Sequence, residues 1–184
     1  MKSADVVVAV ETAHRSRTRL PAVYRREWPI GVGQTRVDLA VIGRHITAFE
    51  VKAWGDDLAR LPQQVKLYSA VADRAVLVVE RTSLLGRALA SVPVWWGVWH
   101  TTAEVGGPRF RTLRAQAPNP TPEPLATAQL LWRDEALQLL DAHGLAVGLR
   151  SATRWRLWQR LADSVPPRLL RREVCAAIRA RPGW

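Results

Sequence analysis

Three short apolar segments that follow one another closely constrain the fold of this chain most. Residues 23–29, 37–42 and 46–51 each have the composition of a β-strand, and glycine-containing turns separate them. Apolar side chains then recur at helical spacing over 57–73, and 75–79 is an all-apolar run of the kind that is buried on both faces of a sheet. Three strands, a crossover helix and a further strand predict an α/β fold.

The segments on either side of this series extend the prediction. Residues 3–19 are expected to form an opening helix, 94–99 another strand and 109–113 an edge strand. A proline-rich segment, 118–124, then precedes a stretch that is helical in character. The helices expected in that stretch are 125–142, 151–163 and 167–180. We therefore expect an α/β core over 1–117, a linker over 118–124 and a basic helical extension over 125–184.

The length and composition fit a globular protein with one main core. The chain has 184 residues, of which 48% are hydrophobic and 23% charged. The lone Cys175 cannot form an internal disulfide or a zinc cluster, which suits a reducing compartment. The longest apolar stretch, 92–99, is far too short to cross a bilayer, and the N-terminal segment lacks the pattern of a secretory signal. We expect a cytoplasmic protein that does not bind membranes.

The charge balance favours polyanionic partners. Lys and Arg number 27 against 16 acidic residues, which gives a formal net charge of +11. Only Lys2, Lys52 and Lys66 are lysines, so the other 24 are arginines, whose planar guanidinium matches phosphate oxygens. A GC-rich genome also produces arginine-rich proteins. Composition alone therefore leaves two explanations about equally open, nucleic-acid binding and genome composition without a binding function.

Charged side chains interrupt two of the expected strands. A three-residue turn at 43–45 pairs Ile42 with Ile46, and the same register brings Asp38 opposite Glu50. Glu50 and Lys52 lie two positions apart and therefore share a face of their strand. The other face carries mostly apolar residues, which predicts that a core face and a chemical face are separate. The residues of that apolar face are Val37, Leu39, Val41, Thr47, Phe49 and Val51.

Two neighbouring carboxylates repel each other unless a cation lies between them. Hard oxygen ligands suit Mg²⁺ or Mn²⁺, which keep several waters and accept phosphate oxygens. A lysine beside such a site can orient the attacking water or neutralise charge that develops on phosphorus. The pattern of Asp38, Glu50 and Lys52 therefore predicts metal-dependent phosphodiester hydrolysis.

The same residues carry a resemblance to a known group of enzymes. Asp38, then eleven residues, then Glu50-Val51-Lys52, with a helix before and a helix and apolar strand after, resembles the PD-(D/E)XK nuclease superfamily. Gln64 and Tyr68 look like the Q-x-x-x-Y element of its RecB-type members, and their i, i+4 spacing suits one helix face. The chain is also similar to a small bacterial family of that superfamily, including the Trp-Trp-Gly motif at 95–97 and the segment 131–135.

The resemblance implies a fold and a set of roles. The fold would be restriction-endonuclease-like, with a mixed central sheet flanked by helices and a helical C-terminal extension. Asp38, Glu50 and the Val51 backbone carbonyl would bind the metal, Lys52 would be the catalytic lysine, and Gln64 and Tyr68 would complete the active site. Many members carry a further acid on the first helix. Here Glu11 is the candidate for that acid, and Glu27 is a second choice.

Arginine-rich segments supply candidate nucleic-acid contacts. Beyond residue 149 the chain has nine arginines and only two acidic residues, so we expect this end to grip a DNA backbone without reading bases. Most of the nine tryptophans are expected in the core, with Trp95 and Trp99 on one face of a strand. The four histidines show no metal-ligand spacing. The candidate nucleic-acid contacts are Arg60, Lys66, Arg154, Arg156 and Arg160.

These observations together favour a Mg²⁺-dependent nuclease that acts on DNA. Two alternatives from other classes stay open at this point. One is a catalytically silent DNA-binding module of the same fold, and the other is a basic structural protein that docks an acidic partner. An ion pair on a strand without a metal is the bland interpretation of Asp38, Glu50 and Lys52, but it does not account for Gln64 and Tyr68 following at the expected places.

Overall fold

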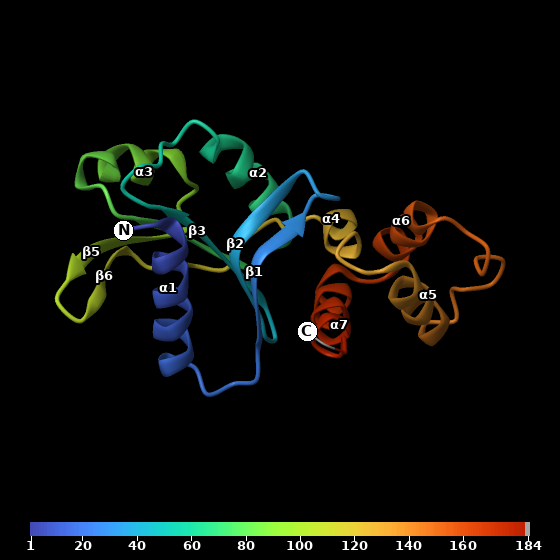
Figure 1. Ribbon diagram of the computed structural model, residues 1–184. Coiled ribbons are helices and arrows are strands. Elements are labelled where there is room, and N and C mark those ends of the chain that lie inside the picture. Colours follow the sequence, from blue (N-terminus) through green and yellow to red (C-terminus); the bar gives the residue numbers. More distant parts are fainter. Residues whose placement is uncertain (183–184) are drawn as a thin grey trace.

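A computed structural model describes residues 1–182 and has a mixed six-stranded sheet at its centre (Figure 1). The strands lie side by side in the order in which they follow along the chain. Pairs β1/β2, β2/β3 and β5/β6 are antiparallel, while β3/β4 and β4/β5 are parallel. The strands are β1 (Val23–Ile30), β2 (Thr35–Ile42), β3 (Ile46–Lys52), β4 (Arg74–Val79), β5 (Gly97–Glu104) and β6 (Gly107–Arg114).

Helices cover both faces of the sheet, which confirms the predicted mixed α/β fold with a helical C-terminal region (Figure 1). Helix α1 (Ser3–Arg17) packs on one face, where its Val6, Val7 and Val10 meet Leu39 and Phe49. Helices α2 (Leu61–Val71) and α3 (Leu85–Ser91) lie on the other face and connect the parallel strands. The C-terminal helices are α4 (Pro124–Ala128), α5 (Arg133–Ala142), α6 (Arg154–Ser164) and α7 (Pro167–Arg179).

The face that carries Glu50 and Lys52 is itself part of the core, so the predicted separation of an apolar face from a chemical face is wrong. Ala48 and Leu77 on this face are fully buried beneath α2 and belong to the larger of two apolar clusters. Val37 also belongs to that cluster rather than to the α1 side. Because α1 and α2 cover the sheet from opposite sides, both faces of the central strands exclude water.

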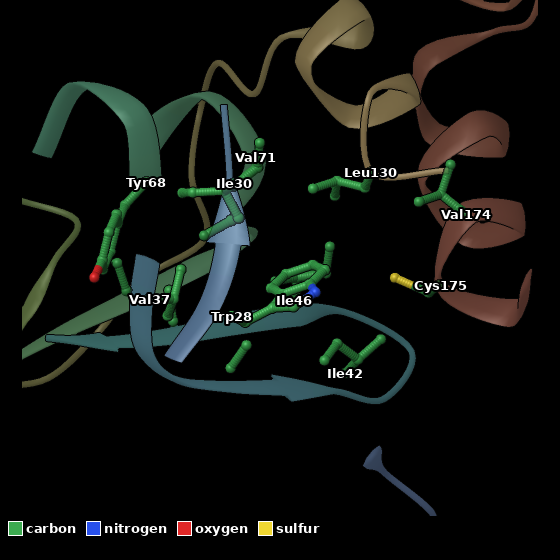
Figure 2. Close-up of a cluster of buried hydrophobic side chains, with 14 of the residues drawn as sticks. Trp28, Ile30, Val37, Ile42, Ile46, Tyr68, Val71, Leu130, Val174 and Cys175 are labelled. Atoms are coloured by element: carbon green, nitrogen blue, oxygen red, sulfur yellow. The ribbon is translucent and has the colours of Figure 1, made fainter. Parts of the chain in front are cut away.

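The C-terminal helices share the larger apolar cluster with the sheet. Figure 2 shows Trp28 and Ile46 of the sheet in the same cluster as Leu130, Val174 and Cys175 of the helical region. The segment between the sheet and these helices is also fixed, since the Asn119 side-chain amide donates to the carbonyls at the end of α2, at 2.7 and 2.8 Å. The extension is therefore packed against the rest of the molecule.

Two predicted elements differ from the structure. Residues 93–96 form a turn, in which the Trp96 N–H donates to the Pro93 carbonyl at 3.0 Å, so β5 begins only at Gly97. Trp95 and Trp96 consequently share one cluster, while Trp99 lies on the α1 side, so the prediction that Trp95 and Trp99 share a face is wrong. The helix expected over 125–142 is two helices, because the chain leaves α4 and restarts where the Glu135 carboxylate accepts the Trp132 N–H at 2.7 Å.

A close approach places the β1–β2 turn against α2. Gly31 has a φ of +59°, which glycine adopts without strain, and a Cβ there would lie 3.1 Å from the Leu67 Cδ2 atom. A larger residue at this position would strain the backbone and require the Leu67 side chain to shift. The turn and α2 together form one end of the hollow in which Asp38 and Glu50 lie.

Candidate active site

The two central antiparallel strands separate at the point where the acidic residues begin. The β2/β3 ladder runs from Ile42↔Ile46, as the three-residue turn predicts, to Leu39↔Phe49, and it stops there. Asp38 and Glu50 occupy the next positions but do not pair through their backbones. Instead, the Asp38 Oδ2 atom accepts the Val51 N–H at 2.7 Å. A carboxylate thus replaces the backbone partner, and it opens a gap between the strands.

The backbone of Val51 presents a second oxygen to this gap. The N–H and C=O of one residue point toward the same edge of a β-strand. Since the Val51 N–H points toward Asp38, its carbonyl faces the β2 side as well. The neighbouring Lys52 carbonyl faces the other edge, where it accepts the Glu80 N–H at 2.9 Å. The carbonyl that the resemblance implies as a ligand therefore lies on the side of the carboxylates.

Glu50 and Lys52 form a buried ion pair on the α2 face of the sheet. Glu50 is 1% exposed and Lys52 4%, and the Lys52 Nζ atom lies 2.8 Å from Glu50 Oε1. The same Nζ donates to Gln64 Oε1 of α2 at 2.9 Å. An ammonium group has three N–H donors, so one remains for a further acceptor. Gln64 is therefore placed where it holds the lysine side chain.

Tyr68, one turn beyond Gln64 on α2, completes the contacts of Glu50. Its hydroxyl lies 2.5 Å from Glu50 Oε2 and 2.9 Å from the Arg36 carbonyl. A hydroxyl has only one proton to donate, and the carboxylate is the nearer and stronger acceptor. Burial and the neighbouring carboxylates raise the pKa of Tyr68, which keeps this hydroxyl protonated as a donor. Gln64 and Tyr68 thus reach the site from the helix face predicted by their spacing.

The site is short of positive charge. Burial, and after it the charge of Glu50, raise the pKa of Asp38 to about 7, although the Val51 N–H and Lys52 act in the opposite direction. Glu27 adds a smaller effect of the same sign as Glu50. The Lys52 ammonium group therefore pairs with the buried Glu50, and within residues 1–182 the half-buried Asp38 carboxylate forms no ion pair.

A polar cavity of about 550 Å³ opens beside these groups. Asp38, Glu50 and Lys52 line its floor, and Gln64 lines it from α2. Exposed side chains, among them Arg60, contribute to its rim. The cavity lets solvent or a small part of a larger substrate reach the carboxylates.

Of the two candidates for a further acid, Glu27 lines this cavity and Glu11 does not; Asp56 also lines it, with its Oδ2 atom accepting the Ala53 N–H at 2.9 Å. Glu11 lies on α1, where its two carboxylate oxygens pair with Arg15 at 2.9 Å and Arg26 at 2.8 Å, and it is not part of the cavity wall. Glu27 lines the cavity and has a φ of +50°, an unusual conformation at an interruption of the β1/β2 ladder. The β1/β2 register, which pairs Arg26 with Leu39 and Trp28 with Val37, places Glu27 level with Asp38.

The oxygen atoms at this site fit a magnesium ion bound mainly through water. Within residues 1–182, no three His, Cys, Asp or Glu side chains converge closely enough to hold a metal by themselves. Mg²⁺ commonly uses one or two carboxylates and fills its other positions with water or substrate oxygens. Asp38, Glu50 and the Val51 carbonyl meet that requirement, and a cation would also relieve the repulsion that raises the Asp38 pKa.

The predicted nucleic-acid contacts do not form one surface. Arg60 lines the carboxylate cavity, whereas Lys66 is exposed elsewhere on α2. Arg154 lies over the Trp158 ring at 5.3 Å and lines a cavity beside the β1–β2 turn. Arg156 and Arg160 line a different cavity of α6. Helical spacing explains the split, since residues two apart point in nearly opposite directions while residues four apart share a face.

Comparison with known proteins identifies one family. A family model described as Bacteriophage P4 protein cII matches residues 5–182, which is nearly the whole chain. No curated protein and no solved structure matches the chain. None of the helices within residues 1–182 combines the length and the apolar character that a membrane crossing requires.

Proposed function

The chain belongs to the bacteriophage P4 protein cII family, and we propose that it is a metal-dependent nuclease of the PD-(D/E)XK type that hydrolyses phosphodiester bonds in DNA. One observation carries the proposal. Asp38 and Glu50 meet where β2 and β3 separate, with Lys52 bonded to Glu50 and with a polar cavity above all three. A buried ion pair that served stability alone would not require the extra, unpaired carboxylate of Asp38.

Asp38, Glu50 and the Val51 carbonyl would hold a Mg²⁺ or Mn²⁺ ion. The bound cation would lower the pKa of a water molecule and polarise the phosphate group. Glu50 is held for this task by Lys52 at Oε1 and by Tyr68 at Oε2. These two contacts fix the carboxylate orientation, which is what supporting residues around a metal ligand provide.

In this proposal Lys52 would act on the substrate directly. Two of its N–H groups point to Glu50 and Gln64, and the third can donate to a phosphate oxygen or to the attacking water in the cavity. A fixed ammonium group beside a phosphate stabilises the negative charge that builds up in the transition state. Gln64 is a positioning residue, because it acts through Lys52.

The charge of the whole chain supports a nucleic-acid substrate. The net charge of +11 attracts a phosphate backbone by releasing condensed counterions. Arg60 at the rim of the carboxylate cavity extends this attraction to the site itself. DNA is the substrate class that the resemblance to PD-(D/E)XK nucleases favours.

The experiment that tests this function is cleavage of labelled single-stranded and duplex DNA with Mg²⁺, Mn²⁺ or EDTA. The wild type is compared with Glu50→Gln and Lys52→Met, which keep the side-chain size at the buried pair. We expect metal-dependent cleavage and a loss of at least about 100-fold in each variant, consistent with the removal of one transition-state contact. Glu104→Gln, an exposed carboxylate at the end of β5, is the matched control and retains wild-type cleavage.

Binding of the same DNA in EDTA separates catalysis from folding. Variants that bind like the wild type but do not cut support the proposed roles. A wild type that binds DNA and never cuts, with either metal, contradicts the nuclease proposal and favours a silent DNA-binding module. Equal cleavage by the wild type and Glu50→Gln contradicts the assignment of the site.

A further inference from the structure

A second cavity, of about 600 Å³, is lined by cationic side chains from two distant parts of the chain. It lies between the β2–β3 turn and α7, which Figure 1 shows next to each other at the edge of the molecule. We call this cavity the arginine cleft. Its lining residues are Arg44, His45, Arg168, Arg171, Arg172 and Arg179.

The walls of the arginine cleft are held by two of its own arginines. The Arg179 guanidinium donates to the Gly43 carbonyl and so ties α7 to the turn of the hairpin. Arg171 pairs with Asp73, at the start of β4, at 3.2 Å. Both side chains are partly buried. The cleft is therefore a built feature of the fold rather than a chance approach of flexible side chains.

The remaining arginines of the cleft carry charge without local compensation. Arg44, Arg168 and Arg172 are exposed, and none of the carboxylates in residues 1–182 forms an ion pair with them. Like charges brought together on one surface repel each other and oppose folding. A bound anion removes that repulsion, and guanidinium groups match phosphate oxygens with paired hydrogen bonds.

The length of the cationic row favours a polymer over a single small anion. Arg168 and Arg179 are eleven residues apart on α7, which corresponds to about 16 Å along the helix axis. One DNA strand advances about 3.4 Å per nucleotide, so the row is as long as about five nucleotides. A free phosphate ion would contact only a small part of it.

We propose that the arginine cleft binds successive phosphate groups of a nucleic-acid backbone, at a distance from the carboxylate site. This inference rests on the proposed function, since it names how the same substrate is held. Ile42, where the turn that carries Arg44 begins, follows Asp38 by four positions of β2, which corresponds to about 13 Å. The cleft would thus increase the affinity for the nucleic acid and orient it. It would do so without sequence preference, because phosphate contacts do not distinguish between bases.

The test is fluorescence anisotropy of a labelled 20-base-pair duplex in EDTA, over a series of KCl concentrations. Arg168→Gln/Arg172→Gln removes two exposed charges of the cleft, and Arg44→Gln removes one from its opposite wall. The matched control, Arg87→Gln/Arg111→Gln, removes two exposed charges on α3 and β6. Circular dichroism confirms that each variant is folded.

We expect the cleft double variant to bind about tenfold more weakly, and its slope of log K against log[KCl] to fall by about 2, since each lost phosphate contact contributes about 0.9. Arg44→Gln lowers the slope by about 1, and the control keeps the wild-type slope. Equal losses in the cleft and control variants overturn the proposal, because they indicate a general effect of net charge. Binding of polyglutamate with the same dependence on the cleft also overturns it, in favour of an acidic protein partner.

The two proposals fail in different ways. Since the assay contains EDTA, it does not depend on cleavage. Cleft-dependent binding without any cleavage keeps the arginine cleft and removes the nuclease assignment. Cleavage that depends on Glu50 but is insensitive to the cleft variants does the opposite.

Discussion

At the level of single residues, the site is defined by how its charges are shared. Lys52 pairs with Glu50, while the half-buried Asp38 carboxylate accepts the Val51 N–H. That arrangement raises the pKa of Asp38 to about 7, chiefly through burial and then through Glu50. A cation bound between the two carboxylates, as proposed, would remove the repulsion that favours this protonation.

The raised pKa of Asp38 predicts a pH dependence of stability in buffer free of divalent ions. The folded protein keeps the Asp38 proton up to about pH 7, whereas the unfolded chain releases it near pH 4. Between these values the folded state binds more protons, so the free energy of unfolding decreases as the pH rises. Asp38→Asn has no such proton to lose. Thermal melts from pH 5 to 8 should therefore show a steeper fall in Tm for the wild type than for Asp38→Asn, and parallel curves contradict the prediction.

A metal-binding role for the same group predicts stabilisation by Mg²⁺. A ligand at 100 times its Kd stabilises the folded state by about 2.7 kcal/mol, so the wild-type Tm should rise with added Mg²⁺. Asp38→Asn should lose this response. Glu27→Gln should weaken it, because Glu27 lines the cavity, while Glu11→Gln should retain it, because Glu11 pairs with Arg15 and Arg26 elsewhere. If Glu11→Gln loses the Mg²⁺ response and Glu27→Gln keeps it, Glu11 on α1 is the further metal-binding acid instead.

Tyr68→Phe tests the contact between α2 and Glu50. The variant removes a hydroxyl 2.5 Å from Glu50 Oε2 and leaves a buried carboxylate with one donor fewer. We expect the free energy of unfolding to fall by about 1–3 kcal/mol, measured by urea denaturation without metal. Tyr24→Phe is the control, since its hydroxyl contacts His14 at a more exposed position where water can replace it. Equal losses in both variants would mean that the hydrogen bond from Tyr68 to Glu50 contributes no more to stability than the contact of Tyr24 with His14.

At the level of elements, the sequence was most informative where one pattern persists over many residues. The opening helix, the hairpin register from Ile42↔Ile46 and the buried strand β4 were all predicted from periodicity and turn length. Helix α3 was missed because it is short and begins with Leu85-Gly86, which leaves little periodicity to detect. The late start of β5 and the break between α4 and α5 depend on hydrogen bonds of Trp96 and Glu135 that composition does not reveal.

Some residues of the candidate site could likewise be predicted from the sequence, and others could not. Asp38, Glu50 and Lys52 could be placed together because a turn of known length fixes which residues lie opposite each other. The position of Glu27 relative to Glu11 could not be ranked correctly, because it depends on a local interruption of β1 and on the packing of α1. The arginine cleft joins a turn and a helix more than 100 residues apart, as the contact of Arg179 with Gly43 shows, and local patterns contain no information about that approach.

An ion pair fixes the segment that follows α7 to α5, and it predicts the effect of one substitution. Arg181 is 6% exposed, pairs with Glu135 at 2.6 Å and donates to the Leu130 carbonyl at 2.8 Å. Arg181→Met leaves the Glu135 carboxylate with little solvent and without this partner, so we expect a loss of about 3 kcal/mol in the free energy of unfolding. Arg156→Met, at an exposed position of α6, should cost less than about 0.5 kcal/mol in the same urea titration. A loss below 1 kcal/mol in Arg181→Met would contradict the anchoring role.

At the level of the whole molecule, the arrangement of the sheet and the C-terminal helices determines what can be bound. The carboxylate cavity lies at one end of the β2–β3 hairpin and the arginine cleft at its other end. A substrate that spans both requires the hairpin and α7 to keep a fixed relation, and the contact between Arg179 and Gly43 supplies one such link. Apolar packing supplies another, since Leu130 and Val174 belong to the same cluster as Trp28 (Figure 2).

This shared cluster predicts that the chain unfolds as one unit. Removal of residues 118–184 would expose the side chains of the sheet that pack against the C-terminal helices, among them Trp28 and Ile46. We therefore expect a single transition in urea, with the same midpoint by far-UV circular dichroism and by tryptophan fluorescence, and a fragment of residues 1–117 that aggregates or lacks a cooperative transition. Two separate midpoints, or a stably folded 1–117 fragment, would mean that the helical extension is an independent domain. In that case the arginine cleft would move relative to the carboxylates, and a substrate held at both places would have to fix the geometry by binding.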